Sequence, residues 1–185
     1  MSKHVAFLRA INVGGRGLVR MTDLCAAFER AGGLNVRTII QSGNVLFEAP
    51  AQDVAGVITR ARNGLRRNLG IEPEIIWRSL SQITAFIEGA PFRDLRPGPT
   101  IKLYVTFLAR KARVIPALPL VSSSEALEVV RINLREVFIV SRPKRRGFFG
   151  FPNNFIEEQF RVPATTRNWS TITKIVGLAT NQTDG

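Results

Sequence analysis

The order of hydrophobic periodicities in residues 1–79 constrains the fold more than any other feature of the sequence. Runs with alternating apolar residues predict strands, and runs with apolar residues at helical spacing predict helices. The predicted order is strand Val5–Ala10, helix Met21–Ala31 with Thr22 as N-cap, hairpin strands Asn35–Gln41 and Asn44–Glu48, helix Ala51–Leu69 and strand Glu74–Arg78. This β-α-β-β-α-β order is that of the ferredoxin-like arrangement, an antiparallel sheet with helices on one face.

The second half of the chain loosely repeats this order, without a repeat visible at the level of residues. After a helix at Leu80–Glu88 and a proline-rich connection, it contains strand Ile101–Leu108, a possible helical turn Arg113–Leu118, hairpin strands Ala126–Asn133 and Glu136–Ser141, and helices Asn154–Phe160 and Ser170–Ala179. The sequence therefore predicts an α+β protein with two ferredoxin-like subdomains and antiparallel sheets, arising from a structural duplication. The predicted boundaries are 1–79, a helix and connector 80–100, a second subdomain 101–180, and a disordered tail 181–185.

Cysteine and histidine content narrows the possible chemistry. Cys25 is the single cysteine and His4 the single histidine, which excludes an intrachain disulfide, a thiolate cluster and a site built on several histidines. We therefore predict no metal and no cofactor. The N-terminal apolar run is too short for a signal peptide, and no stretch approaches the length of a membrane span. These features predict a cytoplasmic protein without a membrane partner.

The charge balance suggests an anionic partner. The formal net charge is +12, from 26 basic and 14 acidic residues. A basic surface attracts nucleic acid because binding releases counterions from the phosphates. Most of the basic residues are arginine, so the alternative is that the bias reflects the base composition of the source genome.

Two turns in the first half concentrate groups that could contact a ligand. The loop that follows the first strand combines Arg9 and Asn12 with Gly14 and Gly15, and paired glycines allow either a close backbone approach to an anion or a tight turn. The tip of the first hairpin carries Gln41, Ser42, Gly43 and Asn44. Their side chains could bind a ligand or could stabilise the turn itself.

Two segments of the second half combine cations with aromatic residues. Phe148, Phe149 and Phe151 follow a basic run with the cations Arg142, Lys144, Arg145 and Arg146. This pairing is used to hold phosphate and to stack the bases of single strands, although a solvated loop beside core phenylalanines would also explain it. The segment Thr165–Thr171 precedes the last predicted helix, where part of it would cap the helix and Arg167 with Trp169 would suit an anionic or planar ligand.

Three segments resemble the signature segments of domain-of-unknown-function family 1697: FLRAINVGG, RTIIQSGNVLF and TTRNWSTITK, in this order and over nearly the whole chain. Ala10 and Ile39 depart from the usual pattern. The resemblance implies a bacterial cytosolic protein with two ferredoxin-like subdomains and no established activity. It carries over as candidate ligand-binding residues Arg9, Asn12, Gly14, Gly15, Gln41, Ser42, Gly43, Asn44, Thr166, Arg167, Asn168, Trp169 and Lys174, which we hypothesise to meet in a polar cleft between the halves.

Three functions remain open from the sequence. The first is a non-enzymatic module for nucleic acid or an anionic nucleotide-like ligand, in which Arg9 and Arg167 bind the anion and Trp169 stacks. The second is a small-molecule enzyme with Lys174 or Asp23 as the proton-transfer group, and the catalytic residues are otherwise unknown. The third is a structural or protein-interaction role, in which the same residues form an internal hydrogen-bond network.

Overall fold

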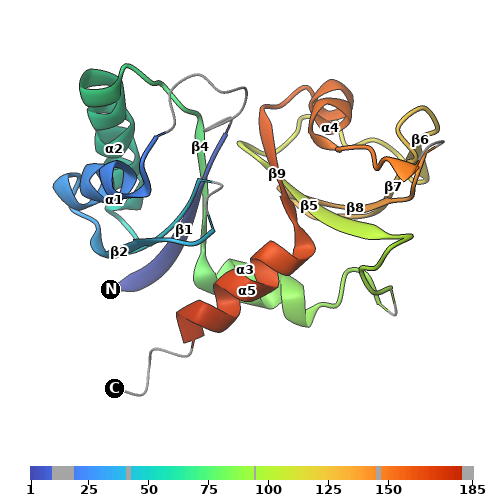
Figure 1. Ribbon diagram of the computed structural model, residues 1–185, viewed down its shortest axis with the longest axis horizontal. Helices are drawn as coiled ribbons and strands as arrows, with labels where there is room; N and C mark the ends of the chain where they lie inside the picture. The colour runs from blue at the N-terminus through green and yellow to red at the C-terminus, as the bar shows by residue number, and fades with distance from the viewer. Residues whose placement is uncertain (10–18, 41–42, 94, 145–146, 181–185) are drawn as a thin grey trace. The chain divides into compact units, whose positions relative to one another are not determined.

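The computed structural model describes residues 1–9, 19–40, 43–93, 95–144 and 147–180 (Figure 1). These residues form an α+β protein with five helices and nine strands, and each of its two sheets is antiparallel. The chain divides into two units within the helix that follows the fourth strand. The first unit comprises Met1–Thr84 with the C-terminal segment from Ala179, and the second comprises Ala85–Leu178.

The first unit follows the element order predicted for residues 1–79. Its elements are β1 (Ser2–Leu8), α1 (Met21–Arg30), β2 (Leu34–Thr38), β3 (Asn44–Ala49), α2 (Val54–Leu69) and β4 (Ile75–Ser79), followed by α3 (Leu80–Glu88). The strands form a sheet in the order β2-β3-β1-β4. Each predicted strand and helix is therefore present, with its ends displaced by a few residues.

Alternation along β1 places the core of this unit between the sheet and two helices. Ala6 and Leu8 pack in one cluster with Leu24 and Phe28 of α1 and Leu65 of α2. Figure 1 shows α1 and α2 on the same side of the sheet. Because side chains alternate across a strand, Val5 and Phe7 point to the opposite face, and both are also fully buried.

The start of α1 differs from the predicted cap. Thr22 lies inside the helix, and the residue before the helix is Arg20, whose backbone is extended and whose side chain makes no capping hydrogen bond. Instead, Arg20 Nε donates to Asp23 Oδ2 at 3.0 Å. Asp23 is an acidic residue in the first turn, where its negative charge interacts favourably with the positive end of the helix dipole.

The second unit contains two strands that the periodicity did not predict. Its elements are β5 (Lys102–Leu108), β6 (Leu120–Ser122), β7 (Leu127–Ile132), β8 (Glu136–Ser141), α4 (Asn153–Phe160), β9 (Ala164–Asn168) and α5 (Trp169–Thr180), with the sheet order β6-β7-β8-β5-β9. The helical turn predicted at Arg113–Leu118 is wrong, because Pro116 and the following Pro119 lack the backbone donors that a helix needs.

Strand β9 occupies the segment that was interpreted as a helix cap. Its two threonines are β-branched and favour extended backbone, and Thr166 pairs with Thr106 of β5. Tyr104 and Leu108 of β5 face α4, in a cluster with Ile156 and Phe160. The opposite face carries aromatic side chains, and the ring of Trp169 lies 5.0 Å from Phe92 and 6.1 Å from Phe138, measured between centroids.

The two sheets share a strand order. Without β6, the second sheet reads β7-β8-β5-β9, which corresponds position by position to β2-β3-β1-β4. The registers also agree, because Val5 pairs with Arg78 in the first sheet and Val105 pairs with Arg167 in the second. The difference lies after the first strand of each unit: α1 connects β1 to β2, whereas irregular backbone and the short β6 connect β5 to β7.

Among the described residues, no helix has both the length and the apolar composition needed to cross a membrane.

Candidate functional site

Seven of the predicted site residues lie outside the described residues: Asn12, Gly14, Gly15, Gln41, Ser42, Arg145 and Arg146. Their roles stay predictions. The rest lie on three parts of the fold: the end of β1 with the start of β3, the segment β9–α5, and the loop that follows β8.

The described residues of the first two predicted sites make contacts within the fold. Arg9 Nη1 lies 3.7 Å from Glu74 Oε2, and both side chains are partly exposed. Asn44 is fully buried, and its Nδ2 donates to the carbonyl oxygen of Ile39 at 3.1 Å across the hairpin turn. Gly43 has φ 72, a left-handed conformation that favours glycine. These contacts account for Gly43 and Asn44 as turn residues, which was the structural alternative considered from the sequence.

Arg167 is held along β9. Its Nη1 donates to Thr165 Oγ1 at 2.7 Å and to the carbonyl oxygen of Thr166 at 2.9 Å. Burial lowers the pKa of Arg167 to about 10, which leaves the guanidinium cationic at neutral pH. Thr166 Oγ1 forms hydrogen bonds with Thr106 Oγ1 at 2.8 Å and with Asn153 Oδ1 at 3.2 Å.

The first unit contains a counterpart of this arginine. Arg78 is almost fully buried in β4, and its Nη1 donates at 2.7 Å to the carbonyl oxygen of the preceding residue, Trp77. It occupies the same register position against Val5 that Arg167 occupies against Val105. An arginine at this position is thus common to both sheets, which indicates that Arg167 contributes to the structure of its sheet.

Trp169 and the other residues around the start of α5 differ in exposure. The Trp169 ring is half-buried among Phe86, Phe92 and Phe138. Asn168 and Lys174 are exposed. A ligand that stacks on Trp169 would therefore meet a ring that already has three aromatic neighbours.

The described cations of the predicted nucleic-acid-binding loop form ion pairs. Arg142 Nη1 lies 2.8 Å from Glu128 Oε2, and Lys144 Nζ lies 3.0 Å from Glu125 Oε2. Phe148 and Phe151 are exposed, and the ammonium of Lys102 lies 4.4 Å from the centroid of the Phe149 ring. A phosphate at this loop would have to compete with two carboxylates for Arg142 and Lys144.

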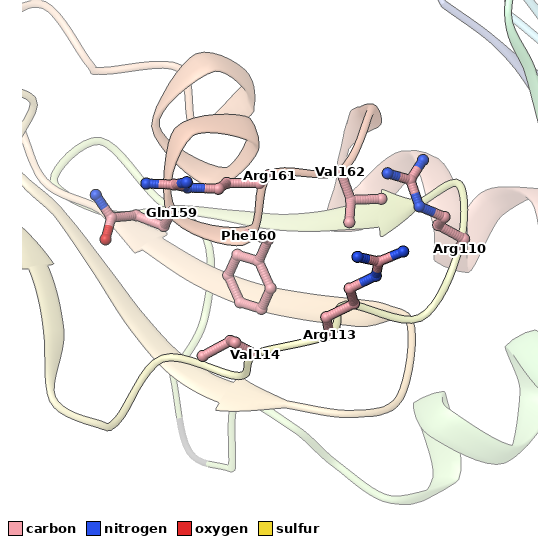
Figure 2. A pocket seen from close by; sticks show the side chains of 7 residues that line it. All are labelled: Arg110, Arg113, Val114, Gln159, Phe160, Arg161 and Val162. Atoms are coloured by element: carbon pink, nitrogen blue, oxygen red, sulfur yellow. The ribbon is translucent and has the colours of Figure 1, made fainter.

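A cavity that the sequence did not predict lies in the second unit, beside the C-terminal end of α4. Its volume is about 650 Å³, and its lining residues are Arg110, Arg113, Val114, Gln159, Phe160, Arg161 and Val162. This volume falls within the usual range for small-ligand sites. Figure 2 shows Arg110 and Arg113 at one end of the group, Gln159 and Arg161 at the other, and the Phe160 ring between them.

Two chain reversals build this pocket. After β5, the backbone nitrogen of Ala109 donates to the carbonyl oxygen of Pro163 at 2.8 Å, which fixes the start of the segment carrying Arg110 and Arg113. Helix α4 is followed by Arg161, which has φ 51 and whose backbone nitrogen donates to the carbonyl oxygen of Glu157. Buried Ala112 and Val162 anchor both segments in the core.

The electrostatics of the pocket are one-sided. All three arginine side chains are exposed, and none has an ion-pair partner among the described residues. No aspartate or glutamate is among the lining residues that the structure describes. Cations with no carboxylate among the described lining residues, beside the apolar Val114 and Val162, suit a ligand that carries an anion and an apolar or planar part.

The pocket could not be predicted from local sequence patterns, because its two walls lie about fifty residues apart along the chain. The available signal was the cluster Arg110, Lys111 and Arg113 directly after a buried strand, together with Arg161 directly after a helix. The possible helical turn expected at Arg113–Leu118 included Arg113 but gave no reason to place it near Arg161. Only the packing of α4 against β5 brings the two groups together.

Comparisons with known proteins establish the family and the fold. A family model described as "Protein of unknown function (DUF1697)" matches residues 1–138. The resemblance inferred from the sequence is thereby confirmed, although TTRNWSTITK lies beyond the matched range. No curated protein matches. The conserved bacterial protein SP0830 from Streptococcus pneumoniae has a similar structure, with 21% identity, a TM-score of 0.57, and coverage of 96% of this chain and 98% of that chain.

Proposed function

The chain belongs to the DUF1697 family of proteins of unknown function, and from that premise we propose that its second unit binds an anionic nucleotide-like ligand in the three-arginine pocket. The ligand is a free nucleotide or a nucleotide at the end of a nucleic acid strand. The observation that carries the proposal is the set Arg110, Arg113 and Arg161, three guanidinium groups around one cavity without ion-pair partners among the described residues.

The shape of the pocket supports a ligand with two different ends. Arg110 and Arg113 offer planar donor groups that match the oxygens of a phosphate. Val114 and Phe160 offer an apolar wall for a sugar or base. Gln159 and Arg161 at the other end offer donors and one amide acceptor for the polar edge of a base.

The chemistry of the lining supports binding rather than catalysis. Arginine stays protonated in proteins, and glutamine, valine and phenylalanine do not transfer protons, so the described lining contains no general acid or base. Neither proton-transfer candidate of the alternative enzyme hypothesis lines this pocket. Asp23 forms an ion pair with Arg20, and Lys174 lies on the exposed side of α5.

The experiment is a titration of fluorescent nucleoside monophosphate, followed by anisotropy, with wild-type protein and the double variant Arg110→Gln/Arg113→Gln. We expect affinity to fall by about tenfold or more, because charge-assisted hydrogen bonds are worth roughly 1.5–3 kcal/mol each. The matched control is Arg30→Gln/Arg67→Gln, which removes the same charge from exposed positions on α1 and α2.

Equal losses in the two double variants would attribute binding to the net charge and would contradict the pocket. Competition separates the two sources of the ligand. If unlabelled mononucleotide displaces the probe at lower concentration than single-stranded RNA or DNA ends, the ligand is a free nucleotide, and the reverse order indicates a strand end. Competition by inorganic phosphate measures how much of the affinity comes from the anion, since phosphate lacks the apolar part of a nucleotide.

A second candidate function is single-strand binding at the loop that follows β8. It is favoured by the exposed rings of Phe148 and Phe151 beside Arg142 and Lys144. Stacking of a base on an aromatic ring contributes roughly 1–3 kcal/mol and tolerates any sequence. We expect Phe148→Ala/Phe151→Ala to weaken binding of single strands and to leave mononucleotide binding unchanged, which assigns the two ligands to separate places.

The finer description of the fold is also a proposal: two ferredoxin-like units related by duplication. Support comes from the shared strand order, from the pairs Val5–Arg78 and Val105–Arg167, and from a short residue repeat that becomes visible only when the two sheets are aligned by these pairs. Residues 78–84 (RSLSQIT) and 167–173 (RNWSTIT) agree in arginine, serine, isoleucine and threonine at equal spacing. In this view the pocket lies where the second unit has lost its first helix. Cytoplasmic location likewise stays a prediction.

A further inference from the structure

We propose that strand β6 is a docking edge for an extended acidic segment of a partner protein, which would add as a further strand to the second sheet. This inference goes beyond nucleotide binding. The residues of β6 lie outside the pocket lining, whereas Arg110, Arg113 and Val114 of the preceding segment belong to it. Strand β6 (Leu120–Ser122) lies at the end of its sheet and pairs with β7 on one side. Its outer edge therefore presents backbone groups in the geometry that β-strand addition uses.

Composition distinguishes β6 from the other strands that end a sheet. Strands β2, β4 and β9 each carry an arginine, namely Arg37, Arg78 and Arg167, whereas the residues of β6 are leucine, valine and serine. Charged residues on an edge strand, including ones that point inward as the buried Arg78 and Arg167 do, are a common protection against pairing with other chains. Among the terminal strands of the two described sheets, β6 is the one without that protection.

Exposed apolar side chains accompany this edge. Val114, Ile115, Leu118 and Val121 are all exposed, within eight residues of chain. Val121 pairs with Glu128 of β7. The residues on either side of Glu128, Leu127 and Val129, pack in the core that faces α4. Because side chains alternate along a strand, the Val121 side chain lies on the opposite face of the sheet. Pro116 and Pro119 restrict the backbone of the segment that leads into β6, which reduces the conformational entropy lost when a partner binds.

Charge decides between the possible occupants. The segment from Ala109 to Ser122 contains Arg110, Lys111 and Arg113 and no acidic residue, so its net charge is +3. A second copy of this chain would bring the same basic segment, and its formal net charge of +12, to the interface. Repulsion between like charges disfavours that pairing, whereas alternating acidic and apolar residues would match both the cations and the exposed side chains.

The test uses the full chain and a synthetic peptide of alternating glutamate and valine with capped ends, labelled for anisotropy. A second peptide has lysine in place of every glutamate. A third has proline at alternate positions, so that it keeps charge but cannot form a strand ladder. We expect the acidic peptide to bind, the lysine peptide to bind at least about tenfold more weakly, and the proline peptide to lose binding.

The variants compare Val121→Glu with Leu134→Glu, because both side chains are more than half exposed, at 53% and 65%, and belong to the same unit. We expect Val121→Glu to weaken the acidic peptide by about tenfold, through repulsion at the edge, and Leu134→Glu to leave it unchanged. Val121→Lys should retain binding, which shows that the loss in Val121→Glu comes from charge rather than from misfolding.

Hydrogen exchange gives the structural readout. Addition of a strand should slow amide exchange at Leu120–Ser122 in the complex, because newly bonded amides are protected. Absence of binding by the acidic peptide, equal effects of Val121→Glu and Leu134→Glu, or protection elsewhere would each overturn the proposal. Dimerisation of the wild-type chain that Val121→Glu abolishes would identify a second copy as the occupant and would overturn it too. Nucleotide binding should survive Val121→Glu, which separates this proposal from the arginine pocket.

Discussion

Arg161 combines backbone strain with a place in the candidate pocket. It ends α4 with φ 51, a left-handed conformation that costs a residue with a side chain roughly 1 kcal/mol relative to glycine. Glycine is also the residue most often found at this position after a helix. An arginine at a strained position where glycine would fit better is consistent with a role for its guanidinium, and this can be tested.

We predict that Arg161→Gly raises the free energy of unfolding by up to about 1 kcal/mol and weakens mononucleotide binding by roughly three- to tenfold. The measurements are urea unfolding and the anisotropy titration. The control is Arg93→Gly, since Arg93 is also exposed, has φ 49 and lies outside the pocket lining. It should change stability in the same direction without affecting affinity. Unchanged affinity in Arg161→Gly would remove this residue from the site.

At the scale of elements, the loop between β8 and α4 depends on one close approach of two backbones. Ser141 Oγ donates to the carbonyl oxygen of Gly150 at 3.1 Å, and Gly150 lies against the backbone of Glu125 in the turn that precedes β7. A Cβ at position 150 would overlap the carbonyl oxygen of Glu125. The same turn supplies the carboxylate that pairs with Lys144.

We predict that Gly150→Ala lowers the free energy of unfolding by roughly 1–3 kcal/mol, because neither backbone can move without breaking these contacts. It should also weaken any binding of single strands that depends on Phe148 and Phe151. The control Gly177→Ala on α5 meets no atom within 4 Å and should be neutral or stabilising by up to about 1 kcal/mol. Equal stability of the two variants, measured by urea unfolding, would contradict the predicted overlap.

At the scale of the whole molecule, the response of stability to pH near neutrality depends on a single histidine. His4 is buried in β1, with ring centroids 5.6 Å from Phe47 and 5.8 Å from Trp77. Burial lowers the pKa of His4 below its usual value of 6.5. As the pH falls through 6.5, the unfolded chain therefore binds a proton that the folded chain does not.

We predict that stability falls as the pH is lowered from 7.5 to 5.5, with a histidine contribution of at most about 1.4 kcal/mol per pH unit. Urea unfolding of wild type and His4→Phe, across this range, isolates that contribution. The same pH dependence in both proteins, or a stability that rises toward acid, would show that His4 is not buried as a neutral group.

Elements defined by local patterns were predictable from the sequence. The apolar stripe of α2 and its stop at Gly70, which has φ 64, depend on neighbours three or four residues away, so the helix could be recognised directly. Strand β9 could not be recognised in this way. Its threonines and asparagine suit a helix cap as well as an extended strand, and pairing with β5, about sixty residues earlier, decides between them.

The candidate sites also differ in whether local or long-range interactions determine them. Asn44 and Gly43 were identified from the sequence, with a turn as the structural alternative, because side-chain to backbone bonds in a hairpin tip are local. The sequence made Arg167 a candidate anion ligand, and that role stays a prediction. Its hydrogen bonds along β9 and its counterpart Arg78 became visible only in the sheet register. Arg110, Arg113 and Arg161 were not identified.

What the sequence determined by itself is the α+β class, the family, the first unit's order of elements and the absence of histidine or thiolate clusters. These follow from residue type and short-range periodicity, which act within a few turns of the chain. The tertiary structure decided the positions of β6 and β9. It also decided that Arg142 and Lys144 each form an ion pair with a glutamate of the same unit, and that three arginines meet at the end of α4. Long-range pairing and packing determine those features, because they bring together groups whose separation along the chain carries no local signal.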